Sequence, residues 1–132
     1  MQKREAAFVV LFRPDGRLYC VENNKGQVGV PGGKREFDRD ARLWHTAQRE
    51  FEEETGGPLC LGELPYIQFA EAHYLCRFYY ARISATLAAC LPVGRVHDPA
   101  GTEQHVFWGT PAPDNMRAHV RAGLFLIDTV AR

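Results

Sequence analysis

Residues 31–56 read PGGKREFDRDARLWHTAQREFEEETG, and the strongest indications of the fold and chemistry of this chain lie in them. Within it, Leu43, Ala47 and Phe51 recur at intervals of four residues and form an apolar stripe. A stripe at this spacing is typical of a helix that packs one face on a core. The stretch therefore predicts an amphipathic helix over residues 40–55.

Both ends of this helix carry recognisable signals. Gly56-Gly57-Pro58 follows its last turn in the order expected where a helix stops. Asp38 or Asp40 precedes the first turn, where a short acidic side chain can accept hydrogen bonds from free backbone N–H groups. One of these two aspartates is expected to be the N-cap.

The helix carries three glutamates whose spacing calls for a chemical explanation. Glu50, Glu53 and Glu54 stand at i, i+3 and i+4, so their carboxylates project from one face and repel one another. A solvated face is the ordinary interpretation of glutamates on a helix. A hard divalent cation such as Mg²⁺ or Mn²⁺ takes oxygen ligands and would offset the repulsion.

The residues around the glutamates favour the metal site. Gly32 and Gly33 let the backbone approach closely upstream of the helix, and Arg49 can hold the carboxylates by charge-assisted hydrogen bonds. Hydrolysis of a diphosphate needs cations to neutralise phosphate oxygens and a carboxylate to position or deprotonate water. The segment has both parts.

This segment resembles the Nudix box of the Nudix hydrolase family (MutT-like). The family pattern is a Gly, five residues, a Glu, seven residues, and then Arg-Glu-apolar-any-Glu-Glu-any-Gly-apolar. Residues 49–56, REFEEETG, match the second half at every defined position, after the Pro-Gly-Gly-Lys at 31–34. The resemblance extends over essentially the whole chain and implies a Nudix fold.

The first half of the box departs from the pattern. Gly33 and Arg49 are sixteen positions apart rather than fourteen, so the box is read as lengthened by two residues. The register from Arg49 places the first Glu of the pattern at Ala41, and Gly57 stands where the family has an apolar residue. Asp40 or Asp38 is expected to replace the missing Glu as the partner of Arg49.

The resemblance also implies site residues. Glu53 and Glu54 are the expected metal ligands, with Glu50 as a further ligand or as the group that orients the attacking water. An acid a few residues before a late Trp is frequent in the family, so Glu103, before Trp108, is the candidate and Asp98 the second choice. The full set is Glu50, Glu53, Glu103 and Arg49 for catalysis, Lys34 and Gly33 for substrate binding, and Gly32, Glu50, Glu53 and Glu54 for Mg²⁺ or Mn²⁺.

Outside this segment, apolar runs and turn residues predict the other elements. The order strands, helix, strands, helix indicates an α+β chain with a mixed sheet flanked by helices. The length fits one domain, 1–132. Strands are expected at 6–12, 18–22, 28–30, 66–70, 74–83 and 105–108, a loop with one helical turn at 85–101, and a closing helix at 114–130.

Composition limits the partners. With 16 basic and 16 acidic residues the formal net charge is zero, which argues mildly against RNA and other large polyanions. No stretch suits a signal peptide or a membrane span, and Cys20 and Cys76 lie in apolar runs typical of buried reduced thiols. A cytoplasmic protein is expected, as a monomer or homodimer.

The sequence therefore predicts a metal-dependent hydrolase that cleaves a diphosphate linkage in a small nucleotide-like molecule. Two alternatives stay open. One is a decapping enzyme that acts on a capped RNA end. The other is a non-catalytic binding module with the same fold, although such modules tend to lose the glutamates that this chain keeps at positions 50, 53 and 54.

Overall fold

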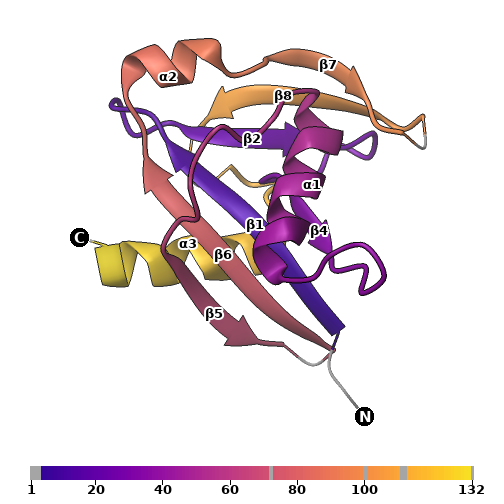
Figure 1. The fold of residues 1–132 in the computed structure, drawn as a ribbon. Coiled ribbons are helices and arrows are strands. Elements are labelled where there is room, and N and C mark those ends of the chain that lie inside the picture. Colours follow the sequence, from indigo (N-terminus) through magenta and orange to yellow (C-terminus); the bar gives the residue numbers. More distant parts are fainter. Residues whose placement is uncertain (1–3, 72, 100, 111–112, 132) are drawn as a thin grey trace.

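The computed structural model describes residues 4–71, 73–99, 101–110 and 113–131. Within them, eight strands form one mixed sheet and three helices pack around it (Figure 1). The elements are β1 (Arg4–Phe12), β2 (Leu18–Glu22), β3 (Val28–Gly29), β4 (Gly32–Lys34), α1 (Leu43–Thr55), β5 (Tyr66–Ala70), β6 (Tyr74–Arg82), α2 (Ala85–Cys90), β7 (Gly94–His97), β8 (Glu103–Gly109) and α3 (Ala118–Ala131). The predicted mixed sheet between helices is confirmed.

Strand β1 lies at the centre of the sheet and is buried on both faces. Ala7, Val9 and Leu11 belong to the core under α1, whereas Ala6, Phe8 and Val10 belong to the core that α3 covers. Because successive side chains of a strand point to opposite faces, a strand between two cores must be apolar throughout. This explains the uninterrupted apolar run near the start of the sequence.

The sheet splits between β1 and β2. Its strand order is β5-β6-β1-β2-β8-β7, with β1 parallel to β6, but β1 and β2 pair only where Phe12 lies opposite Leu18. Beyond that point β4 pairs with β1, and β3 pairs with β2. The opening between the two halves of the sheet positions the site described below.

Helix α1 packs as the apolar stripe predicts. Leu43, Ala47 and Phe51 are all buried, and the helix ends at Gly56, whose φ of 79° is the left-handed conformation that glycine adopts freely. The predicted start was wrong. The N-cap is Arg42, whose side chain accepts no capping hydrogen bond, and the helix begins at Leu43 rather than at residue 40.

The stretch 85–101, expected as a loop with one helical turn, contains the short helix α2 and also the strand β7. Helix α2 starts where the Ser84 hydroxyl accepts a hydrogen bond from Leu87 N–H, and β7 pairs with β8 at the edge of the sheet. Only Val96 of β7 packs against a core, so this four-residue sequence is too short and too polar to be recognised as a strand. Strand β4 (Gly32–Lys34) likewise lies outside the strands expected from the sequence.

The closing helix starts later than predicted. Before α3, the backbone bridges to β3: Val28 N–H donates to Asn115 O, and Arg117 N–H donates to Val28 O. Backbone groups used in that bridge cannot make helical hydrogen bonds, so the helix begins at Ala118 rather than at 114. Cys20 and Cys76 are buried free thiols, as predicted. No helix in the described part of the chain is long and apolar enough to cross a membrane.

Candidate active site

Arg49 is the centre of the polar network on α1. Its Nε and Nη2 atoms donate to the two carboxylate oxygens of Asp40, at 3.0 and 2.8 Å. Its Nη1 atom lies 2.9 Å from Glu50 Oε1 and 3.4 Å from Glu53 Oε2, and Nη2 also donates to the carbonyl of Lys34. One guanidinium thus fixes two glutamates of the helix and the loop that precedes it.

The acid that holds Arg49 is Asp40, which confirms one of the two predicted partners. Its side chain is only 2% exposed and also accepts hydrogen bonds from the Thr46 hydroxyl and the backbone N–H of Glu36. Burial alone would raise the pKa of Asp40, but these hydrogen bonds, above all those from Arg49, lower it to about 2. Asp38 is exposed and makes no such contact among the described residues.

Glu54 reaches into the opening of the sheet. Its Oε1 accepts a hydrogen bond of 2.7 Å from the backbone N–H of Gly32. Gly32 of β4 lies opposite Phe8 of β1. Hydrogen-bonded and non-hydrogen-bonded pairs alternate along two antiparallel strands, and Phe8 and Gly32 form a non-hydrogen-bonded pair. The N–H and carbonyl of Gly32 therefore point away from β1. Desolvation of the Glu54 carboxylate raises its pKa to about 8.

Glu50 lies against the same glycine pair. A Cβ atom built on Gly33 would stand 2.5 Å from Glu50 Cδ, so any other residue at 33 would displace this carboxylate. Burial, followed by the charge of Glu53, raises the pKa of Glu50 to about 6, although Arg49 acts in the opposite direction. A side chain at position 33 would therefore act by moving the Glu50 carboxylate rather than by a clash with the backbone of α1.

The carboxylates fit a divalent cation by their chemistry. Three oxygen donors share one helix face, and burial opposes the charge on two of them, Glu50 and Glu54. Among the described residues, however, no three acids, histidines or cysteines are already gathered around one point. Glu50 and Glu53 turn to Arg49, while Glu54 binds the N–H of Gly32. A cation would compete with these contacts.

Two joined cavities extend from Glu54 towards α3. The smaller, about 160 Å³, contains Glu54 and Gln104, and the larger, about 430 Å³, contains Lys34 and Tyr74. Both are lined by Phe8, Gly32, Arg117 and His119. The glycines, Lys34 and Glu54 thus share one cleft.

Sequence reasoning missed the far wall of this cleft. Arg117 and His119 come from the start of α3, and the His119 ring packs on Phe8 with 5.1 Å between ring centroids. Lys34 lies 5.7 Å from the centre of the Tyr74 ring. No sequence motif links Arg117, His119 or Tyr74 to the box. The bridge between residue 28 and residues 115–117, together with the packing of Val120 in the core, holds this wall opposite Glu54.

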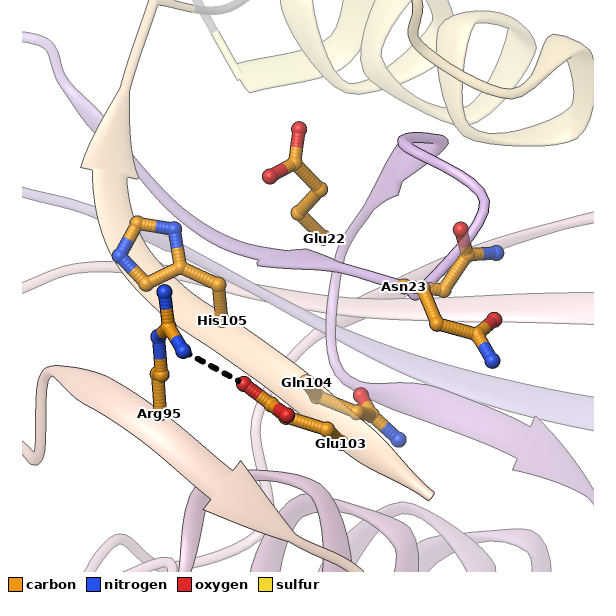
Figure 2. A pocket seen from close by; sticks show the side chains of 7 residues that line it. Glu22, Asn23, Arg95, Glu103, Gln104 and His105 are labelled. Atoms are coloured by element: carbon orange, nitrogen blue, oxygen red, sulfur yellow. Dashed lines mark ion pairs between the residues drawn. The ribbon is translucent and has the colours of Figure 1, made fainter.

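Glu103 lies outside the two cavities that flank Gly32. It is the first residue of β8, and its carboxylate pairs with Arg95 of β7 at 3.2 Å (Figure 2). It lines a third cavity next to the cleft, whereas Gln104 lines both that cavity and the one beside Glu54. Asp98 accepts a hydrogen bond from Thr102 N–H in the loop before β8.

A kinetic measurement tests the catalytic role predicted for Glu103. We expect Glu103→Gln to lower turnover more than substrate affinity, because a ligand or water-holding role needs the charge. The melting temperature should change little, since the pair with Arg95 is exposed and such pairs contribute about 0–1 kcal/mol. Full turnover at every metal concentration would make Glu103 an ordinary surface residue, and Asp98→Asn the next variant to measure.

Comparison with known proteins identifies the family to which this arrangement belongs. The model of the NUDIX domain matches residues 2–113. The chain belongs to this family. Nudix domains typically depend on divalent metal ions and typically act as pyrophosphohydrolases. None of the curated proteins matches the sequence.

Solved structures show the same fold at low sequence identity. The MutT protein from Methanosarcina mazei Go1 superposes with a TM-score of 0.68 at 16% identity, over 100% of this chain and 99% of that one. The NUDIX domain of Shewanella oneidensis NrtR, complexed with ADP ribose, gives 0.63 at 21% identity, over 99% and 88%. An ADP-ribose pyrophosphatase from Streptococcus suis 89-1591 gives 0.62 at 15% identity, over 99% and 93%.

Proposed function

We propose that this Nudix domain is a metal-dependent hydrolase that cleaves a diphosphate linkage in a small nucleotide derivative. The observation that carries the proposal is the position of Glu54. It lies in a cleft beside Gly32, on the same helix face as Glu50 and Glu53, and the basic side chains of Lys34, Arg117 and His119 line the same cleft. Carboxylates for a cation and cations for phosphate oxygens therefore meet in one place.

The residues have separate roles in this proposal. Glu53, Glu54 and the carbonyl of Gly32 would hold Mg²⁺ or Mn²⁺, and Glu50 would be a further ligand or would orient the attacking water. When bound, the metal neutralises phosphate oxygens and makes the phosphorus more electrophilic. Arg49 keeps Glu50 and Glu53 in place through its own anchor, Asp40. Lys34 contacts the phosphates, and Gly33, whose backbone groups pair with Ala7, leaves room for the Glu50 carboxylate.

Water attacks one phosphorus of the diphosphate, and the bond to the bridging oxygen breaks. The products are two phosphate monoesters when each end of the diphosphate carries an organic group. The water proton passes to a carboxylate of the box or to solvent, and the leaving phosphate takes up the negative charge of the broken bond. ADP-ribose is the first substrate to test, because two structurally similar proteins bind it or act on it.

A substrate panel with Mg²⁺ and with Mn²⁺ tests the proposal. It contains ADP-ribose, ATP, a diadenosine polyphosphate and capped RNA, with release of nucleotide or phosphate as the readout. Hydrolysis of a small nucleotide supports the proposal. Exclusive release of the cap would establish the decapping alternative, and tight binding with no turnover of any member would establish the non-catalytic module.

Removal of the metal gives a separate prediction. We expect EDTA to abolish hydrolysis and to leave the circular dichroism spectrum unchanged, because two apolar cores hold the sheet and helices without help from a cation. Addition of excess Mg²⁺ should restore the rate. A large loss of circular dichroism signal on chelation would show a structural metal instead.

A further inference from the structure

A third cavity continues the cleft on the side away from Lys34. It measures about 390 Å³ and lies over the ends of β2, β7 and β8. Asn23 and Gln104 line both this cavity and the one beside Glu54, so the two spaces meet at these side chains. Glu54, which lines the small cavity, thus lies between two larger cavities, one towards Tyr74 and one towards Glu22.

The strand register builds the floor of this third cavity. Glu22 of β2 lies directly opposite His105 of β8, and His105 lies directly opposite Arg95 of β7. Directly opposed residues of neighbouring strands point to the same face. Figure 2 shows these three side chains on one side of the strands, with the Glu103 carboxylate turned towards Arg95.

The lining of this cavity differs from that of the cavity near Tyr74. Every side chain around it is polar or charged: Glu22, Asn23, Asn24, Arg95, Glu103, Gln104 and His105. The cavity near Tyr74 instead includes the side chains of Ala6, Phe8, Tyr74 and Cys76. The cavity near Tyr74 can pack against a flat base. The polar cavity can bind a group that donates and accepts many hydrogen bonds.

Glu22 gives this cavity a hydrogen-bond acceptor that none of the described residues uses. Its half-buried carboxylate makes no hydrogen bond or ion pair with any residue that the structure describes, whereas Glu103 is already paired with Arg95. A carboxylate only accepts hydrogen bonds, and a pair of neighbouring hydroxyls, as in ribose, donates them. Two carboxylates against one arginine also disfavour a phosphate in this cavity.

We propose that the cavity lined by Glu22, His105 and Gln104 binds a neutral, hydroxyl-rich group on the distal side of the diphosphate. The proposal rests on the hydrolysis of a nucleotide diphosphate proposed above and narrows its substrate. The preferred class is a nucleoside diphosphate joined to a sugar or other polyol, rather than a nucleoside triphosphate. Glu22 accepts hydrogen bonds from the hydroxyls, and Gln104 lies at the junction with the cleft.

The test compares ADP-ribose with ATP in the wild type and in Glu22→Gln. We expect the wild type to prefer ADP-ribose in kcat/KM. Glu22→Gln should raise KM for ADP-ribose about tenfold, as expected from the loss of hydrogen bonds to a charged acceptor, and should change ATP hydrolysis much less. Gln104→Ala should reduce the same preference. Glu52→Gln, on the exposed side of α1, is the matched control and should leave both substrates unchanged.

Calorimetric titration separates this inference from the proposed hydrolysis. ADP-ribose and AMP are titrated into Glu53→Gln and into the double variant with Glu22→Gln, so that binding is read without rapid turnover. We expect Glu53→Gln to bind ADP-ribose more tightly than AMP, and the double variant to bind the two equally. This result supports the proposed binding of a hydroxyl-rich group beside Glu22 even if no hydrolysis is found. Equal KM for ADP-ribose in wild type and Glu22→Gln, a wild-type preference for ATP, or no binding of ADP-ribose overturns it.

Discussion

Glu53→Gln and Glu54→Gln are each expected to lower turnover by about a hundredfold or more while the fold is retained. A neutral amide is a poor ligand for a hard cation, and loss of even ~3 kcal/mol of transition-state stabilisation slows a reaction by about two orders of magnitude. The fold should survive because the side-chain amide introduced by Glu54→Gln would still offer an oxygen to the N–H of Gly32. Steady-state kinetics over a range of Mg²⁺ and Mn²⁺ concentrations measures the effect.

Glu52→Gln provides the control for both variants. Glu52 is on the same helix and carries the same charge, but it is exposed and its side chain makes no hydrogen bond or ion pair among the described residues. Its substitution should leave turnover and melting temperature unchanged. If Glu53→Gln or Glu54→Gln kept near-wild-type turnover at saturating metal, the assignment of these carboxylates to the metal would fail.

The part of the site that lies within one helix and its upstream loop could be predicted from the sequence. The spacing of Glu50, Glu53 and Glu54 fixes their common face as soon as the helix forms. The glycines at 32 and 33 indicate a close approach between the backbone and another group, and at Gly33 that group is the Glu50 side chain. The geometry of one helix and its neighbouring loop was enough to predict the positions of these residues.

The opposite wall depended on long-range pairing that no local pattern records. Arg117 and His119 face Glu54 because residues 115–117 bridge to Val28, almost ninety positions earlier. Strand β7 was missed for a related reason. It is an edge strand with only Val96 against a core, so its position depends on its partner β8 rather than on its own sequence.

Glu103 and Gln104 illustrate a limit of motif-based inference. The resemblance points to an acid near this position, but it does not fix which face of β8 each side chain occupies. Neighbouring residues of a strand point to opposite faces, so a shift of one residue exchanges them. In the structure Gln104 lines the cavity of Glu54, and Glu103 pairs with Arg95. This places an amide, rather than the predicted carboxylate, at the junction of the two cavities.

Asp40→Asn is expected to destabilise the protein by about 3 kcal/mol at neutral pH. Asp40 is 2% exposed and its partner Arg49 12%, and removal of one charge from such a buried pair leaves the other uncompensated. The effect should depend on pH. The pKa of Asp40 is lowered to about 2, below the ordinary 3.8, so its stabilisation is present above pH 3.8 and is lost as the pH falls through 2.

Chemical denaturation of the wild type, Asp40→Asn and Asp38→Asn at several pH values measures this dependence. The difference between wild type and Asp40→Asn should shrink by about 2 kcal/mol between pH 4 and pH 2. Asp38→Asn should change the free energy of unfolding by less than about 0.5 kcal/mol, because Asp38 is exposed. Equal losses in the two variants, or an Asp40→Asn effect that is the same at pH 2 and pH 7, would show that the charge of Asp40 does not anchor Arg49.

Since Arg49 in turn holds Glu50 and Glu53, a loosened Arg49 should also lower turnover at temperatures where Asp40→Asn is still folded.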